Sequence, residues 1–299
     1  MTVGGLIPLT RPGTDRWVIR GGALQVDRPR LLGIINVTPD SFSDGGNFFS
    51  AGDAIAHAGR LLEEGADILD VGGESTRPQG ATPVPADEEL RRVIPVIEGI
   101  RSRHPTALIS IDTVKADVAR AAIEAGAHIV NDVSGFRLDV RMGDVCASTG
   151  AGVILMHSRG GVSDMARYEH AVYGDDVMGD VLAELEGSVA AAERAGVAPS
   201  AIALDPGIGF GKRGVHSATL LRELPRLVAL GHPVVVGVSR KRFISELSRS
   251  PEPAERVPGS IAASLVALLR GARLFRVHDV AASRQALDVA WALLGEGRA

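Results

Sequence analysis

Polar and charged side chains follow short apolar runs at many points of the 299-residue chain. Carboxylate, amide and ammonium groups at these positions offer hydrogen-bond donors and acceptors in a mixed set. Such a set suits the edge of a flat heterocycle, because a buried polar edge that is left unmatched costs binding energy. The positions that could form this pocket are Asp112, Asn131, Asp205 and Lys241.

A second group of side chains at similar positions suits a phosphate. Arg77, Arg276 and His278 supply positive charge, and the arginines can donate two parallel hydrogen bonds. Asn36 carries a neutral oxygen of the kind that Mg²⁺ accepts, since this ion completes its shell with water and substrate phosphates. The chain has no zinc-type Cys/His spacing, no GxSxG motif and no Walker-type loop. GIGFGK at 207–212 is typical of a tight strand-to-helix turn.

Eight apolar runs of strand length precede these side chains, and each run ends in a polar or charged group or leads directly into one. The runs are apolar almost throughout, as in parallel strands that are covered on both faces. A lone Asn or His at a strand end is usually a turn residue, but eight such ends favour a common site. The runs are Leu31–Asn36, Ile68–Gly73, Leu108–Asp112, Ile129–Asp132, Val153–His157, Ile202–Asp205, Val234–Ser239 and Leu274–His278.

Segments of helical periodicity separate most of these runs. Apolar stripes occur within 90–100, 181–189 and 287–294. Strand–helix alternation repeated eight times predicts a single (β/α)8 TIM barrel of the α/β class rather than an open doubly wound sheet. Roughly 250 residues suffice for such a barrel, so the chain is long enough. Barrels of this class carry their chemistry at the carboxyl ends of the strands.

We expect residues 1–30 to form an extension and residues 31–299 the barrel. Within the extension, Trp17–Arg20 and Ala23–Val26 flank two glycines and predict a hairpin that could plug the bottom of the barrel.

Composition narrows the classes of partner. The net charge of −4 argues against a nucleic-acid surface, and no segment reaches the roughly 18 apolar residues of a membrane span. The single cysteine, Cys146, is expected to be a packed side chain. The N-terminal segment lacks the pattern of a secretion signal, so a cytoplasmic location is expected.

The sequence blocks around these ends resemble those of the dihydropteroate synthase family over residues 31–280. NVTPDSFSDGG and GGESTRP are the most specific of them. The matching blocks are LLGIINVTPDSFSDGG at 31–46, DILDVGGESTRP at 67–78, SIDT at 110–113, NDVSG at 131–135, MHSRG at 156–160, LDPGIGFGK at 204–212, VGVSRKRF at 236–243 and FRVHDV at 275–280.

The resemblance implies a transferase that joins 6-hydroxymethyl-7,8-dihydropterin diphosphate to 4-aminobenzoate and releases diphosphate. It implies Asn36 as the Mg²⁺ contact and Ser239 beside the aminobenzoate carboxylate. Loops 37–50 and 75–87 would exclude water from the reaction. The pterin pocket would comprise Asp112, Asn131, Asp205 and Lys241, the diphosphate end Thr76, Arg276 and His278, the loop contacts Phe42 and Pro78, and the catalytic groups Asp112, Asp44, Arg77 and Lys241. Members of the family are commonly homodimers.

Two positions depart from the family pattern, and two alternative functions compete with this interpretation. Gln79 is an extra residue in the second loop, and Ser217 stands where the family often has Asn. A pterin-binding methyltransferase would share the Asp and Asn contacts but has no use for a diphosphate site. A catalytically silent paralogue would be expected to have lost loop or phosphate residues, and Asn36, Asp44 and Arg77 are all present.

Overall fold

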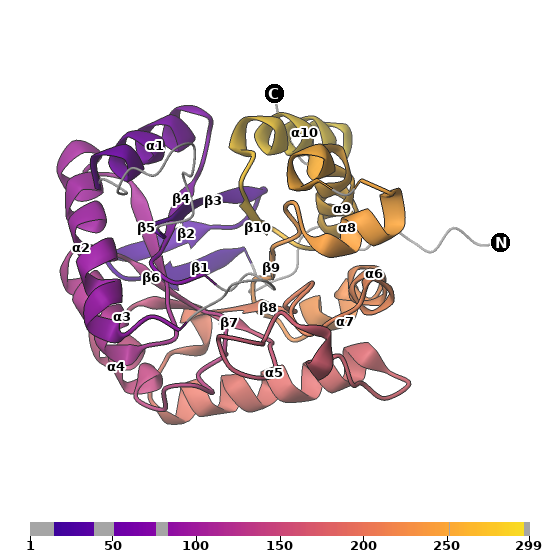
Figure 1. Ribbon diagram of the computed structural model, residues 1–299, viewed down its shortest axis with the longest axis horizontal. Coiled ribbons are helices and arrows are strands. Elements are labelled where there is room, and N and C mark those ends of the chain that lie inside the picture. Colours follow the sequence, from indigo (N-terminus) through magenta and orange to yellow (C-terminus); the bar gives the residue numbers. More distant parts are fainter. Residues whose placement is uncertain (1–14, 39–50, 76–82, 251, 296–299) are drawn as a thin grey trace.

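Eight parallel strands form the interior of the computed structural model, which describes residues 15–38, 51–75, 83–250 and 252–295 (Figure 1). They pair in the order β8-β7-β6-β5-β4-β3-β10-β9, and a parallel bridge between Leu204 and Val234 brings the two outer strands together. This arrangement confirms the predicted (β/α)8 barrel. The strands are β3 (Arg30–Asn36), β4 (Ile68–Gly72), β5 (Leu108–Asp112), β6 (Ile129–Asp132), β7 (Gly152–Met156), β8 (Ile202–Asp205), β9 (Val235–Val236) and β10 (Leu274–Val277).

Helices surround the strands on the outside of the barrel (Figure 1). The predicted stripes face inward: Val93, Ile97 and Ile100 are fully buried in the helix over 86–103, as is Val181 in the helix over 177–194. The helices are α1 (Ala51–Glu63), α2 (Ala86–Arg103), α3 (Ala116–Glu124), α4 (Met142–Thr149), α5 (Val177–Arg194), α6 (Gly214–Arg222), α7 (Leu224–Val228), α8 (Arg242–Ser248), α9 (Val257–Leu269) and α10 (Val280–Leu293), with short 3-10 turns η2 (Tyr168–His170), η3 (Pro199–Ala201) and η4 (Pro253–Arg256).

The predicted hairpin closes the amino-terminal end of the barrel. Its strands, β1 (Arg16–Ile19) and β2 (Gly22–Gln25), each begin one residue earlier than predicted. Trp17 is completely buried, and its indole N–H donates to the carbonyl of Ala201 at 2.9 Å. The hairpin packs on an apolar layer that includes Ile68, Ile129 and Leu274. Water is therefore kept out of this end of the barrel.

The inner surface of the barrel changes from apolar to polar along each strand. Side chains that face the interior recur every second residue, so Asp70 and Gly72 face the same way as Ile68. By the same alternation Asn131 follows Ile129, and Arg276 follows Leu274. The strand register also aligns Asn36, Gly72, Asp112 and Asn131 in one row across β3 to β6. The polar side chains thus gather above an apolar floor.

β9 is shorter than the predicted run Val234–Ser239. Beyond Val236 the chain turns, and the N–H of Lys241 donates to the carbonyl of Val238 at 3.3 Å. The Ser239 hydroxyl accepts from the N–H of His278 at 3.1 Å. In a longer strand, a backbone carbonyl of the neighbouring strand would accept from this N–H. A side chain therefore replaces backbone pairing at this part of the barrel mouth.

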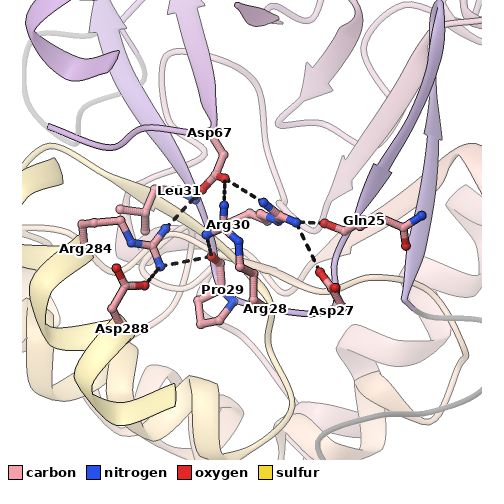
Figure 2. A network of polar contacts seen from close by, with 9 residues as sticks. All are labelled: Gln25, Asp27, Arg28, Pro29, Arg30, Leu31, Asp67, Arg284 and Asp288. Carbon is pink, nitrogen blue, oxygen red and sulfur yellow. Dashed lines mark hydrogen bonds and ion pairs between the residues drawn. The ribbon is translucent and has the colours of Figure 1, made fainter. Parts of the chain in front are cut away.

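One carboxylate joins several segments at the amino-terminal end of the barrel (Figure 2). Asp67, between α1 and β4, accepts from Arg28 at 2.9 Å, from Arg30 at 3.1 Å and from Arg284 of α10 at 3.2 Å. It also accepts from the backbone N–H of Leu31 at 2.9 Å. The Asp67 side chain is only 10% exposed. This network ties the segment after the hairpin to the first strand and the last helix of the barrel.

Replacing Asp67→Asn should lower the free energy of unfolding by about 1–3 kcal/mol, because three guanidinium groups would lose a shared, largely buried carboxylate. Urea denaturation measures the change. The exposed Asp87→Asn is the matched control and should change stability by less than about 0.5 kcal/mol. Equal unfolding midpoints for the two variants would show that the network contributes nothing.

Candidate functional site

A guanidinium bridges two carboxylates inside the mouth of the barrel. Arg276 of β10 donates through Nε to Asp70 of β4 at 2.6 Å and through Nη2 to Asp112 of β5 at 2.7 Å. The amide of Asn131 donates to the same Asp70 oxygen at 3.2 Å. Asp70 is completely buried and Arg276 largely so. One cation therefore links three strands, and β3 lies between two of them.

The buried position of this cluster alters its proton affinities. Burial raises the pKa of Asp112 to about 7, while Arg276 opposes the rise and Asp70 adds to it. Burial alone would lower the pKa of Arg276, but Asp70 and Asp112 raise it above its ordinary value. The guanidinium therefore stays charged.

A second cation lies in the turn after β9, the strand next to β10. Lys241 donates through Nζ to the carbonyl of Ile208 at 2.6 Å, and the same nitrogen lies 4.5 Å from the ring centre of Phe210. Burial lowers the pKa of Lys241 to about 8, against the influence of Asp205. Burial raises the pKa of Asp205, whose carboxylate accepts from the N–H of Gly207 at 2.7 Å.

The ends of the first and last barrel strands form one edge of the mouth. β3 and β10 are hydrogen-bonded neighbours, so Asn36, the last residue of β3, and His278, which follows β10, belong to adjacent strands. The Ser239 hydroxyl lies 3.0 Å from His278 Nδ1. Among the described residues, the half-buried side chain of Asn36 has no hydrogen-bond partner. A neutral oxygen is thus available at this edge.

The structure brings together most of the predicted site residues. Asp112, Asn131 and Arg276 belong to one hydrogen-bonded cluster, and Asp205 and Lys241 influence each other electrostatically. The other predicted residues, which are Phe42, Asp44, Thr76, Arg77 and Pro78, lie outside the described residues.

Sequence reasoning missed several buried charged residues, and two of them, Asp70 and Lys212, interact with predicted site residues. Asp70 was absorbed into the apolar run Ile68–Gly73, although an acid at an inward-facing position of a strand could have marked it. Lys212 ends the glycine-rich turn and is completely buried, with Nζ 2.8 Å from Nδ1 of His157. This contact joins His157, at the end of β7, to a buried lysine.

Two kinds of feature are absent from the described residues. No helix there is long and apolar enough to cross a membrane. No group of three or more His, Cys, Asp or Glu side chains in the same part of the chain could hold a metal ion. Cys146 is buried, as predicted, and burial raises the pKa of its thiol.

The chain is similar to known proteins over nearly its whole length. Residues 32–278 match the family described as pterin binding enzyme. The dihydropteroate synthase of Synechocystis sp. is 46% identical over 89% of this chain and 90% of its own length. That of Escherichia coli strain K12 is 42% identical over 92% of this chain and 95% of its own length.

Solved structures give the same result. A dihydropteroate synthase of Xanthomonas albilineans, solved with 4-aminobenzoic acid, shares 49% identity and a TM-score of 0.86, covering 94% of this chain and 98% of its own. The enzyme of Thermus thermophilus, solved in complex with 6HMPPP, shares 44% identity and a TM-score of 0.80, covering 94% of this chain and 99% of its own.

The raised pKa of Asp112 predicts a pH-dependent stability. Between its ordinary value of 3.8 and about 7, the folded protein binds a proton at Asp112 that the unfolded chain has released. The contribution of Asp112 to the free energy of unfolding therefore falls as the pH rises through this range. Asp112→Asn, which cannot ionise, should gain stability relative to the wild type between about pH 5 and pH 8 in urea denaturation. A difference that is independent of pH would contradict the raised pKa.

Proposed function

The chain belongs to the dihydropteroate synthases of the pterin-binding enzyme family, and we propose that its barrel mouth is divided between a pterin pocket and a diphosphate edge. It is a transferase of folate biosynthesis. The reaction joins 6-hydroxymethyl-7,8-dihydropterin diphosphate to 4-aminobenzoate and gives 7,8-dihydropteroate and diphosphate. The observation that carries the division is the bridge from Arg276 to Asp70 and Asp112, since it places carboxylates deep in the mouth and a guanidinium beside them.

The pterin pocket is assigned to Asp112, Asn131, Asp205 and Lys241. The carboxylates accept from the N–H groups of a pterin edge, and the amide and ammonium donate to its nitrogen and oxygen acceptors. These side chains extend from the ends of β5, β6 and β8 and from the turn after β9. Because they are largely withdrawn from water, each unmatched group would cost affinity, and a ring of another donor pattern would be rejected.

The chemical step proposed is a departure of diphosphate before the amine attacks. The bond between the pterin methylene carbon and the diphosphate oxygen breaks, and diphosphate takes the electron pair. The amine nitrogen of 4-aminobenzoate then bonds to the methylene carbon and loses a proton. Asp112 would stabilise the intervening cation, because a negative charge in a site of low dielectric constant acts strongly on a developing positive charge.

The geometry argues against a purely structural role for Asp112. The capping position of α3 is Lys115, and the first N–H group of that helix donates to Asp139 at 2.9 Å. The carboxylate of Asp112 points instead to Arg276 in the mouth. It is therefore not the cap of the helix that follows its strand.

The diphosphate edge is assigned to Arg276 and His278, with Thr76 and Arg77 from the second loop. Arg276 uses Nε and Nη2 for its two carboxylates, which leaves Nη1 for a phosphate oxygen. Its guanidinium is thus already oriented before the substrate arrives.

Mg²⁺ is the metal proposed for this edge, with Asn36 as its protein ligand. The side-chain amide of Asn36 fits this role, since it has no partner among the described residues and lies next to the strand that bears Arg276. When bound, the ion would offset the charge of the leaving diphosphate.

The two loops and the seventh strand end would complete the aminobenzoate site. Ser239 is assigned to the aminobenzoate carboxylate, and Phe42, Asp44 and Pro78 to loops that exclude water from the cation. Asp44 and Arg77 are assigned to catalysis together with Asp112 and Lys241.

We further propose a homodimer in the cytoplasm. Exposed apolar side chains occur on both α9 and α10, which pack together: Val266 and Leu269 on the first and Val289 and Leu293 on the second. A second copy that covers these four side chains would remove apolar area from water. The buried, unpaired Cys146 suits a reducing compartment.

Asp112→Asn should reduce the rate of diphosphate release by about 10²–10³-fold, since it removes one preorganised charge. Pterin affinity should fall less, because the variant keeps one acceptor oxygen and its lost charge matters most for the cation. Single-turnover release and the melting temperature are measured on the same preparation. An unchanged chemical rate in folded protein would rule out the cation-stabilising role.

A further inference from the structure

Lys212 is a completely buried lysine at the end of the turn between β8 and α6. Its Nζ lies 2.9 Å from the carbonyl oxygen of Phe210, 2.8 Å from Nδ1 of His157 and 3.4 Å from the carbonyl oxygen of His157. An ammonium has three N–H groups, so each can meet one acceptor. Lys212 therefore joins its own turn to the end of β7.

The same turn holds Lys241 on its other side. Ile208 supplies the carbonyl that accepts from Lys241, and the ring of Phe210 lies below the same ammonium. A Cβ atom on Gly209 would lie 3.2 Å from Cδ of Lys241, and one on Gly207 would lie 1.9 Å from the carbonyl oxygen of His157. The backbone of the turn is thus packed between the two lysines.

Three glycines leave this turn with little stiffness of its own. Gly207, Gly209 and Gly211 have φ angles of 66°, 80° and 56°, which residues with a side chain rarely adopt. Glycine backbone loses more conformational freedom on folding than any other, so bonds to the rest of the protein must fix it. Lys212 supplies such bonds at the end of the turn.

Burying a lysine at this position costs free energy, because its charge is removed from water. Burial lowers the pKa of Lys212 well below its usual range, and Asp205 opposes the effect. Burial together with the charge of Lys212 lowers the pKa of His157 to about 4. His157 therefore accepts at Nδ1 and carries its proton on Nε2, 3.1 Å from a carboxylate oxygen of Glu184. An apolar side chain would fill the space without this cost, so we attribute the lysine to its hydrogen bonds.

We propose that Lys212 is a positioning residue for the transfer reaction. Its bonds to Phe210 and His157 fix the turn whose Ile208 carbonyl and Phe210 ring hold the Lys241 ammonium at the pterin pocket. The inference rests on the pterin-binding role assigned to Lys241 under the proposed function.

A double-mutant cycle tests this role. Lys212→Met keeps most of the side-chain volume and removes the donors, and Lys241→Met removes the group that the turn holds. Lys212→Met should lower kcat/KM for the pterin diphosphate by about 10–100-fold, since a small misplacement of a binding group can cost about 10²-fold. If Lys212 acts through Lys241, the double variant should lose no more than about twofold beyond Lys241→Met alone.

A stability control separates positioning from folding. Asp67→Asn disturbs a polar network at the amino-terminal end of the barrel, far along the strands from the mouth. The folded fraction of this variant should keep kcat/KM within about twofold of the wild type, as expected of a change away from the site. The folded fraction of Lys212→Met should instead show the lower kcat/KM.

The outcomes are distinguishable. Losses that multiply in the double variant, or a Lys212→Met variant with wild-type kcat/KM, would overturn the inference. A Lys241→Met variant with wild-type kcat/KM would instead refute the pocket assigned to Lys241. If Lys212→Met does not fold, His157→Leu replaces it in the cycle, because it removes one acceptor of Lys212. The double variant of His157→Leu and Lys241→Met should then have nearly the same kcat/KM as Lys241→Met alone. Losses in kcat/KM that multiply would again overturn the inference.

Discussion

The bridge from Arg276 to Asp70 and Asp112 is the interaction on which the mouth of the barrel depends. A buried carboxylate without a partner is unstable, and so is a buried guanidinium. Each of the three side chains is therefore tolerated in the interior because the others are present. Breaking the bridge would leave an uncompensated charge beneath the proposed pterin pocket. This mutual dependence fixes the relative positions of the inner side chains of β4, β5 and β10.

The hairpin supports this polar cluster from the amino-terminal end of the barrel. Trp17 and its neighbours close the amino-terminal opening with an apolar layer, which separates the charged side chains from water at that end. Charges in such a setting interact more strongly than they would in water. The same low dielectric environment raises the pKa of Asp112 and lowers that of Lys241. A substrate with N–H donors along one edge and a phosphate group would meet carboxylates at its donor edge and cations at its phosphate.

Much of this arrangement could be predicted from the sequence. Continuous apolar runs that end in polar residues identified the strands, and the shared direction of parallel strands placed Asp112, Asn131 and Arg276 at one end. Asp70 could not be found in this way, because it stands in the middle of its run and ends no strand. Its partner, Arg276, is 206 positions away, and only the closed barrel brings the two together. Lys212 was missed for a similar reason, since its burial depends on His157 at the end of another strand.

We propose that Asp70 holds Arg276 in the orientation needed to bind the diphosphate. Calorimetry of Asp70→Asn with the pterin diphosphate and with the bare pterin alcohol tests it most directly. Simple charge counting predicts that removing an acid near the site would strengthen binding of an anion. If Asp70 instead orients the guanidinium, affinity for the diphosphate should fall by about tenfold more than affinity for the alcohol, which is a loss of about 1.4 kcal/mol. Tighter or unchanged binding of the diphosphate would contradict it.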